Sequence, residues 1–189
     1  MKQIISREEI EKKETRNKII IGIILVGIMV ISSAGYAFFG TERTNIKKIK
    51  YNNIEFSLQD DNLWHTKIQD YEFSAFYNPK ETENITGFIT LKLGNYYNKP
   101  LFFSYDSDRQ AVEEISRNIE RFAQRVQYVC LDECEEDFPV KNCTDNIIII
   151  KDLNVSLIKQ EDNCVYILAD RDNILRASDA FIYKILGVQ

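Results

Sequence analysis

An uninterrupted apolar run near the N-terminus constrains this chain more than any other feature. Residues 19–39 read IIIGIILVGIMVISSAGYAFF and carry no charge over 21 positions. At about 1.5 Å per residue, a helix of this length is about 31 Å long, which matches the hydrocarbon core of a bilayer. We therefore expect a transmembrane helix over 19–39, preceded by a charged helix over 1–18.

The charges on either side of the run predict its orientation. Six lysines and arginines precede it, and four follow it closely at Arg43, Lys47, Lys48 and Lys50. Basic residues concentrate on the cytoplasmic side of membranes, so residues 1–18 are expected in the cytoplasm. Ser6 starts a capping box that would begin the charged helix. The basic residues after the run are expected to meet lipid headgroups.

Two other interpretations of the N-terminus stay open. The small residues at 32–37 would suit a signal peptidase, although a long leader of mixed charge is not typical of a cleaved signal. A pilus-like envelope subunit also begins with a charged leader and an apolar helix. Its processing site, however, needs a small residue just before the run, where Asn17 and Lys18 stand.

The charge of the chain is divided between its two parts. Residues 1–50 hold 10 Lys/Arg against 5 Asp/Glu, whereas residues 51–189 hold 14 against 24, a net charge of −10. After a polar linker over 40–45, the length leaves room for one medium-sized extracytoplasmic domain over 46–189. Its acidic surface should repel nucleic acid, so none is expected as a partner.

Alternating apolar residues predict an antiparallel β-meander in the first half of this domain. The alternation runs through 49–58 and 64–77, with Asn52-Asn53 as a hairpin turn. Further strands are expected over 88–93 and 101–105. Later apolar runs at 147–150, 155–158 and 165–168 predict a second group of strands.

Two helices are expected beside these strands. Five apolar residues recur at spacings of three and four after a cap at 106 or 107: Val112, Ile115, Ile119, Phe122 and Val126. A last helix is expected over 173–186, stopped by Gly187. Runs of strands with two segregated helices are typical of an α+β domain rather than of alternating βαβ units.

The four cysteines all lie in the outer domain, at Cys130, Cys134, Cys143 and Cys164. An even number is expected where disulfides persist, outside the cytoplasm, so all four are disulfide candidates. Three pairings are open, with a slight preference for Cys134–Cys143 together with Cys130–Cys164. A zinc site is disfavoured because there is no second close pair of thiols.

Residue types that carry catalysis are scarce. The single histidine, His65, lies in a strand pattern and is expected on the face opposite Trp64. Neither a Gly-x-Ser-x-Gly turn nor a glycine-rich phosphate loop is present. We therefore expect no enzymatic activity, catalytic residue, cofactor or metal. The enzymatic alternative is an envelope thiol-disulfide oxidoreductase using Cys130 and Cys134, although the neighbouring acidic residues would raise the pKa of these thiols.

Three segments of the outer domain carry a resemblance to known sequences. They are NCTDNIIIIKD at 142–152, EDNCVYI at 161–167 and DAFIYKILGV at 179–188. Behind a span of this type, they resemble a family of uncharacterised, single-span membrane proteins of archaea with a cysteine-containing α+β outer domain. The resemblance implies a membrane location and this architecture, and it transfers no functional residue.

The leading functional hypothesis is therefore a membrane-anchored extracytoplasmic module that works by binding. Two aromatic pairs, Tyr96-Tyr97 and Phe102-Phe103, are candidates for a surface that contacts another envelope protein or a glycan.

Overall fold

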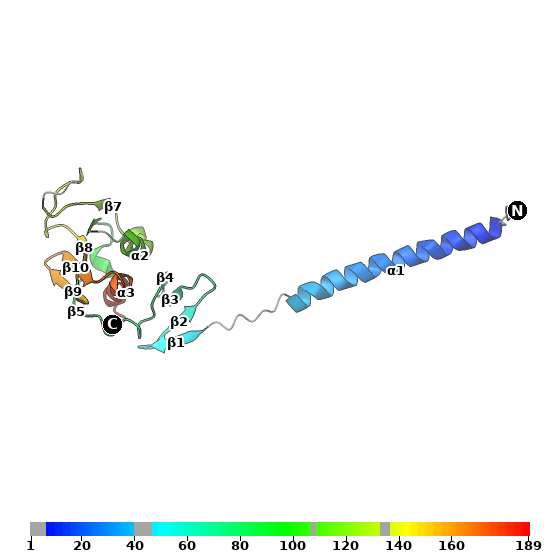
Figure 1. Cartoon of the computed structure of the whole chain (residues 1–189), viewed down its shortest axis with the longest axis horizontal. Coiled ribbons are helices and arrows are strands. Elements are labelled where there is room, and N and C mark those ends of the chain that lie inside the picture. The colour runs from blue at the N-terminus through cyan, green and yellow to red at the C-terminus, as the bar shows by residue number, and fades with distance from the viewer. Residues whose placement is uncertain (1–6, 40–46, 107–108, 133–136) are drawn as a thin grey trace. The chain divides into compact units, whose positions relative to one another are not determined.

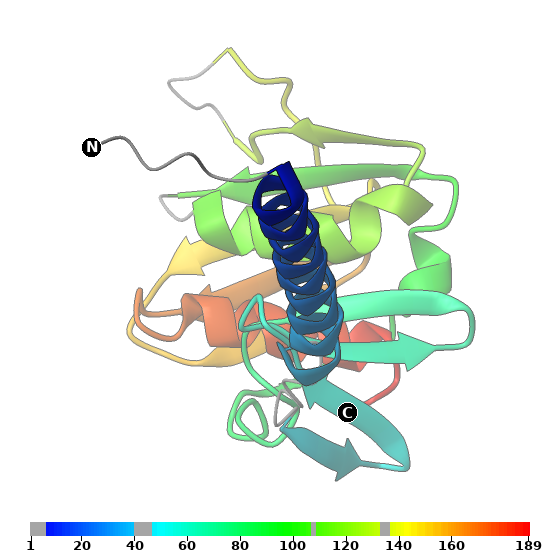
Figure 2. The ribbon, with the colours of Figure 1, turned by 90° about the vertical axis from the view of Figure 1, so that its right-hand side faces the viewer.

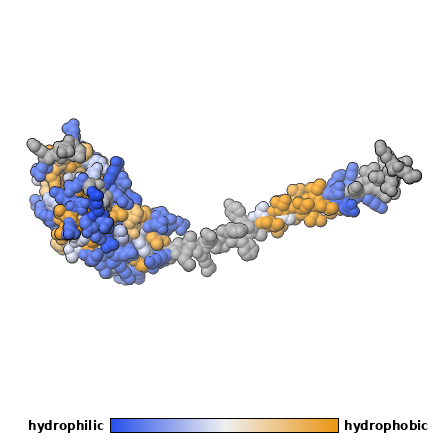
Figure 3. All heavy atoms as spheres, in the orientation of Figure 1, coloured by the Kyte–Doolittle hydropathy of each residue, from blue (hydrophilic) through white to orange (hydrophobic). Residues whose placement is uncertain are grey.

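The computed structural model describes residues 7–39, 47–106, 109–132 and 137–189. The chain divides into two compact units, Met1–Asn45 and Ile46–Gln189. In the first unit, α1 (Arg7–Phe39) is one continuous helix that joins charged and apolar sequence (Figure 1). Its segment Glu14–Ser32 is long and apolar enough to cross a membrane, and Figure 3 shows the apolar band. The predicted cap Ser6 lies outside the described residues.

The second unit begins with a four-stranded antiparallel meander. Its strands follow one another in the order β1 (Lys48–Tyr51), β2 (Ile54–Leu58), β3 (Trp64–Ile68) and β4 (Tyr71–Ala75). Asn52 and Asn53 have φ of 45° and 66°, as a two-residue hairpin turn requires. The amide of Asn52 donates to the carbonyl of Val188 at 2.9 Å, so the C-terminus lies beside this hairpin (Figure 2).

A mixed six-stranded sheet forms the other side of the domain, in the order β5-β9-β10-β8-β6-β7. Its strands are β5 (Thr86–Phe88), β6 (Pro100–Tyr105), β7 (Arg125–Tyr128), β8 (Ile147–Asp152), β9 (Leu157–Glu161) and β10 (Cys164–Ala169). The four strands from β10 to β7 are parallel, and only β9 and β10 pair antiparallel. The helices are α2 (Arg109–Ile119) and α3 (Ile174–Ile185), with short 3₁₀ helices η1 (Leu93–Asn95) and η2 (Glu120–Phe122).

Helices α2 and α3 lie between the two sheets, as Figure 1 shows. The larger hydrophobic cluster joins one face of the six-stranded sheet to both helices and includes Leu101, Phe103, Val112, Ile115, Ile148, Val165, Phe181 and Ile182. A second cluster joins the inner face of the meander to the end of α3 and includes Phe56, Trp64, Ala75, Tyr183 and Val188. The domain therefore has three layers, with helix α3 contributing to both clusters.

The opposite face of the six-stranded sheet is also covered. Ile147 and Ile149 on β8 are fully buried there with Phe102, beneath Val129 and the half-buried Leu131. Strand β8 is thus buried on both faces. This explains why its sequence is a continuous isoleucine run rather than an alternation of apolar and polar residues.

The architecture confirms the expected α+β class, with an N-terminal apolar helix, a meander, two helices and a second strand group. The expected helix through Val126 is wrong, because α2 ends at Ile119 and Val126 lies in β7. Ala123 has an extended backbone, and β7 pairs parallel with β6, so α2 connects two neighbouring parallel strands. Tertiary pairing at this sheet edge overrides the helical spacing of the apolar residues.

The strand expected over 88–93 is also wrong in its position. Strand β5 ends at Phe88, and the side chain of Gln160 accepts hydrogen bonds from the backbone N–H groups of Thr90 and Leu91. A side chain thus takes the place of a neighbouring strand. At Gly87, φ is 141° and an added Cβ would lie 2.0 Å from the carbonyl oxygen of Ile158, so only glycine allows β5 to pair here.

Candidate binding groove

A groove of about 480 Å³ opens where the meander meets the end of α3. Four segments that are distant in sequence line it: the β3–β4 hairpin, residues 92–97, η2 and the C-terminal end of α3. The lining residues are Ile68, Gln69, Tyr71, Phe73, Lys92, Leu93, Gly94, Tyr97, Phe122, Ile185, Leu186 and Gly187. Its volume is in the range of small-molecule sites, and most of its surface is apolar.

The end of α3 shapes one side of the groove. Gly187 has φ of 72° and donates its N–H to the carbonyl of Lys184, while Val188 donates to the carbonyl of Tyr183. This is a Schellman motif, which satisfies the last carbonyls of the helix and turns the chain away. Leu186 is consequently held at the end of the helix, where it lines the groove.

An aromatic cluster forms another side. The ring of Phe122 makes an edge contact with Tyr71 at 4.8 Å and stacks on Phe73 at 6.1 Å between centroids. The guanidinium of Arg121 lies within 6 Å of all three rings and donates to the backbone carbonyl of Glu72. Cation–π contacts of this kind hold rings in place, so this wall is preorganised.

Two lysines meet at the C-terminal end of α3. The ammonium of Lys92, a lining residue, donates to the carbonyl of Lys184 at 2.9 Å. Burial lowers the pKa of Lys184, and the charge of Lys92 lowers it further. No ion pair joins either lysine to an acidic side chain within the described parts of the chain. Lys92 is also the one charged residue among the described residues that line the groove.

The aromatic surface predicted from the two aromatic pairs is only partly correct. Tyr96, Phe102 and Phe103 are buried, whereas Tyr97 is 62% exposed and lines the groove. Tyr71 cannot be recognised as a groove residue from the sequence, because its place in a strand alternation predicts packing rather than binding. The helical spacing likewise predicts that Phe122 packs as part of a helix, whereas α2 ends at Ile119.

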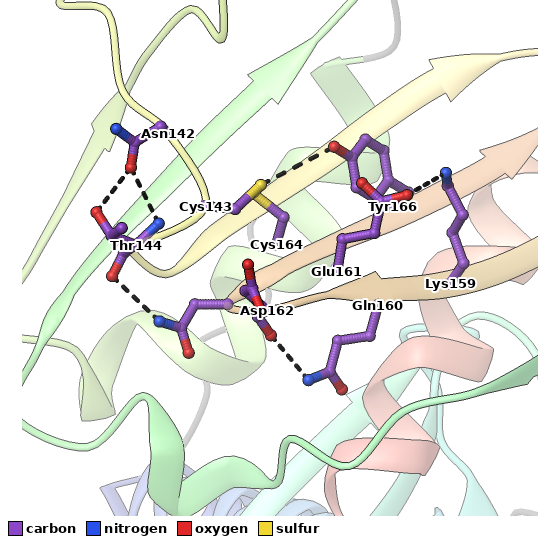
Figure 4. The surroundings of a disulfide bond; sticks show 10 residues. Asn142, Cys143, Thr144, Lys159, Gln160, Glu161, Asp162, Cys164 and Tyr166 are labelled. Atoms are coloured by element: carbon purple, nitrogen blue, oxygen red, sulfur yellow. Dashed lines mark hydrogen bonds and ion pairs between the residues drawn. A yellow bond between two sulfur atoms is a disulfide. The ribbon is translucent and has the colours of Figure 1, made fainter.

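The disulfide pairing preferred from the sequence is wrong. Cys143 is bonded to Cys164, with 5.0 Å between their Cα atoms (Figure 4). Cys164 begins β10 and pairs with Ile147 of β8. Cys143 precedes Ile147 by only four residues, so this pairing brings the two cysteines together. Cys130 is disulfide-bonded as well. Cys134 lies outside the described residues, so a redox role for the Cys130/Cys134 pair stays a prediction.

The histidine contributes to a polar surface instead of the groove. His65 lies in β3, and its Nε2 is 2.8 Å from the carboxylate of Asp61. Their shallow surroundings on the meander are polar and are lined by residues such as Glu55, Lys67 and Glu72. In the described residues, no group of three or more His, Cys, Asp or Glu side chains is arranged to hold a metal ion.

A buried acidic group fixes the chain after β4 onto α3. The carboxyl of Asp179 is fully buried and accepts a hydrogen bond from the backbone N–H of Tyr77 at 2.8 Å, while its Oδ1 atom has no partner. Tyr183 donates its hydroxyl to the carbonyl of Tyr77. Burial raises the pKa of Asp179 to about 8, against the opposing effects of the Tyr77 N–H and Arg117.

No family model, curated protein or solved structure matches this chain. The resemblance to uncharacterised archaeal membrane proteins stays a prediction.

The pKa of Asp179 predicts a specific pH dependence of stability. The folded chain holds this proton more tightly than the unfolded chain, in which the carboxyl has its ordinary pKa of 3.8. The stabilising contribution of the protonated Asp179 carboxyl is therefore full below about pH 4 and is lost as the pH rises to about 8. Between these limits, the free energy of unfolding falls by up to about 1.4 kcal/mol per pH unit.

Asp179→Asn keeps an oxygen for the Tyr77 N–H but removes the titration. We expect the free energy of unfolding in urea to fall less between pH 5 and pH 8 in this variant than in the natural protein. The exposed Asp172→Asn serves as the control and should keep the natural pH dependence. Parallel pH profiles for all three proteins would contradict the assignment.

Proposed function

We propose that this protein is anchored in a membrane by α1, with residues 1–18 in the cytoplasm and the domain 46–189 outside, where the domain works by binding. The groove at the end of α3 carries the proposal. It combines an apolar lining with an exposed aromatic ring and a preorganised aromatic wall, which are features of ligand sites.

Three observations support the membrane anchor and the extracytoplasmic location of the domain. α1 contains a 19-residue stretch, Glu14–Ser32, that is apolar enough to span a bilayer. The Cys143–Cys164 disulfide is typical of proteins outside the reducing cytoplasm. The greater number of basic residues before the span favours a cytoplasmic N-terminus.

Single-cysteine labelling tests the topology. In intact cells, we expect a membrane-impermeant maleimide to label Lys67→Cys and to label Lys12→Cys only after permeabilisation, because Lys67 is exposed on the outer domain and Lys12 precedes the span. Labelling of Lys12→Cys alone would reverse the orientation. A mature chain that has lost the Lys12→Cys segment would show that α1 is cleaved as a signal.

Methyl NMR tests the groove as a binding site. The full chain is placed in phosphatidylcholine nanodiscs, with labelled isoleucine and leucine methyl groups, and is titrated with water-soluble neutral, cationic and anionic fragments. We expect at least one class to shift the methyl signals of Ile68, Ile185 and Leu186 saturably. The signals of Ile147 and Ile149, on the far face of the six-stranded sheet, should not move.

Paired variants sharpen this test. Tyr97→Ser removes an exposed ring from the groove and should weaken fragment binding at least about threefold, because most of the binding free energy comes from burying apolar surface. Phe88→Ser removes an exposed ring that does not line the groove and should leave binding unchanged. The proposal is contradicted if no fragment moves the groove signals.

A further inference from the structure

Hydrogen-bonding groups are few among the side chains that line the groove. They belong to Gln69, Lys92 and the exposed tyrosines Tyr71 and Tyr97. A peptide or a sugar would bury many N–H, C=O or hydroxyl groups there, and each one left without a partner is costly. A hydrocarbon chain has no such groups. The lining therefore favours an aliphatic occupant.

The charges beside the groove are unlike those of the domain as a whole. Residues 51–189 have a net charge of −10, yet Lys92 lines the groove and contacts the last turn of α3 at Lys184. Neither lysine forms an ion pair with an acidic side chain among the described residues. An ammonium group has three N–H donors, and Lys92 gives one to the carbonyl of Lys184, so it can also pair with a negative end group.

We propose that the groove binds a single hydrocarbon chain that ends in a carboxylate, with the chain against the aromatic wall and Leu186 and the carboxylate beside Lys92. This inference rests on the proposed function and adds the chemical class of the ligand. Because α1 is long and apolar enough to cross a membrane, a domain that it anchors would have such amphiphiles close at hand.

Three probes with the same eight-carbon chain test the proposal on the full chain in phosphatidylcholine nanodiscs. They are octanoate, octan-1-ol and octyltrimethylammonium, titrated while the methyl signals of Ile68, Leu93, Ile185 and Leu186 are followed. We expect octanoate to bind at least about tenfold more tightly than either of the other two. Tighter or equal binding of octyltrimethylammonium or octan-1-ol would overturn the carboxylate preference.

Charge variants separate the role of Lys92 from simple partition into an apolar cavity. Lys92→Met keeps an aliphatic side chain, and it should weaken octanoate binding about tenfold but octan-1-ol binding by no more than about twofold. Lys67→Met removes an exposed lysine from the outer face of the meander and should change the binding of neither octanoate nor octan-1-ol. Unchanged methyl spectra of the free variants establish that each is folded.

The outcomes distinguish this inference from the proposed function. Fragment binding in the groove without a preference for octanoate, or without an effect of Lys92→Met, overturns the ligand class and leaves the binding site in place. If neither the three probes nor any other fragment moves the groove signals, both proposals fail.

Discussion

Helix α3 packs against both sheets at once, and the rest of the outer domain depends on this packing. Nine of its twelve residues are buried. Ala177 and Ala180 are fully buried on the side of the six-stranded sheet, where their small size allows close approach, whereas Tyr183 packs edge-on against Phe56 of the meander at 5.7 Å. A helix that is buried on nearly all sides has to be enclosed, here by the two sheets.

Enclosure of α3 also determines where polar groups must be paired. Asp179 and the Tyr183 hydroxyl both bond to the backbone of Tyr77, which ties the chain after β4 to the helix. Asn118 of α2 bonds through its amide to both the N–H and the C=O of Ser74, so the edge of β4 is capped by a side chain. Because an uncapped strand edge invites pairing with other chains, this contact closes the meander on its helix side. The groove is the space that remains at the end of α3, where the packed layers separate.

Much of the fold could be predicted from the sequence because local patterns of apolar residues specify many of its helices and strands. The alternation before residue 78 predicts the meander, the uncharged run predicts α1, and the last apolar helix is placed within a few residues of α3. The failures come from long-range pairing. Val126 continues a helical spacing by coincidence and belongs to β7. The Cys143–Cys164 bond follows from the pairing of β8 with β10, a parallel neighbour that no local pattern specifies. The groove was least predictable, because Tyr71, Phe122 and Leu186 meet only after both sheets have packed on α3.

Because α3 packs against both sheets, we expect the two sheets to unfold as one cooperative unit, and urea unfolding of the full chain tests this directly. Trp64 is the single tryptophan and lies in the meander cluster, so its fluorescence reports that sheet. The methyl signals of Ile148 and Ile150 report the six-stranded sheet. If α3 is shared as described, both probes will change with the same urea midpoint. A Trp64 transition at clearly lower urea, with native methyl signals retained, would show that the meander unfolds alone and would contradict the account.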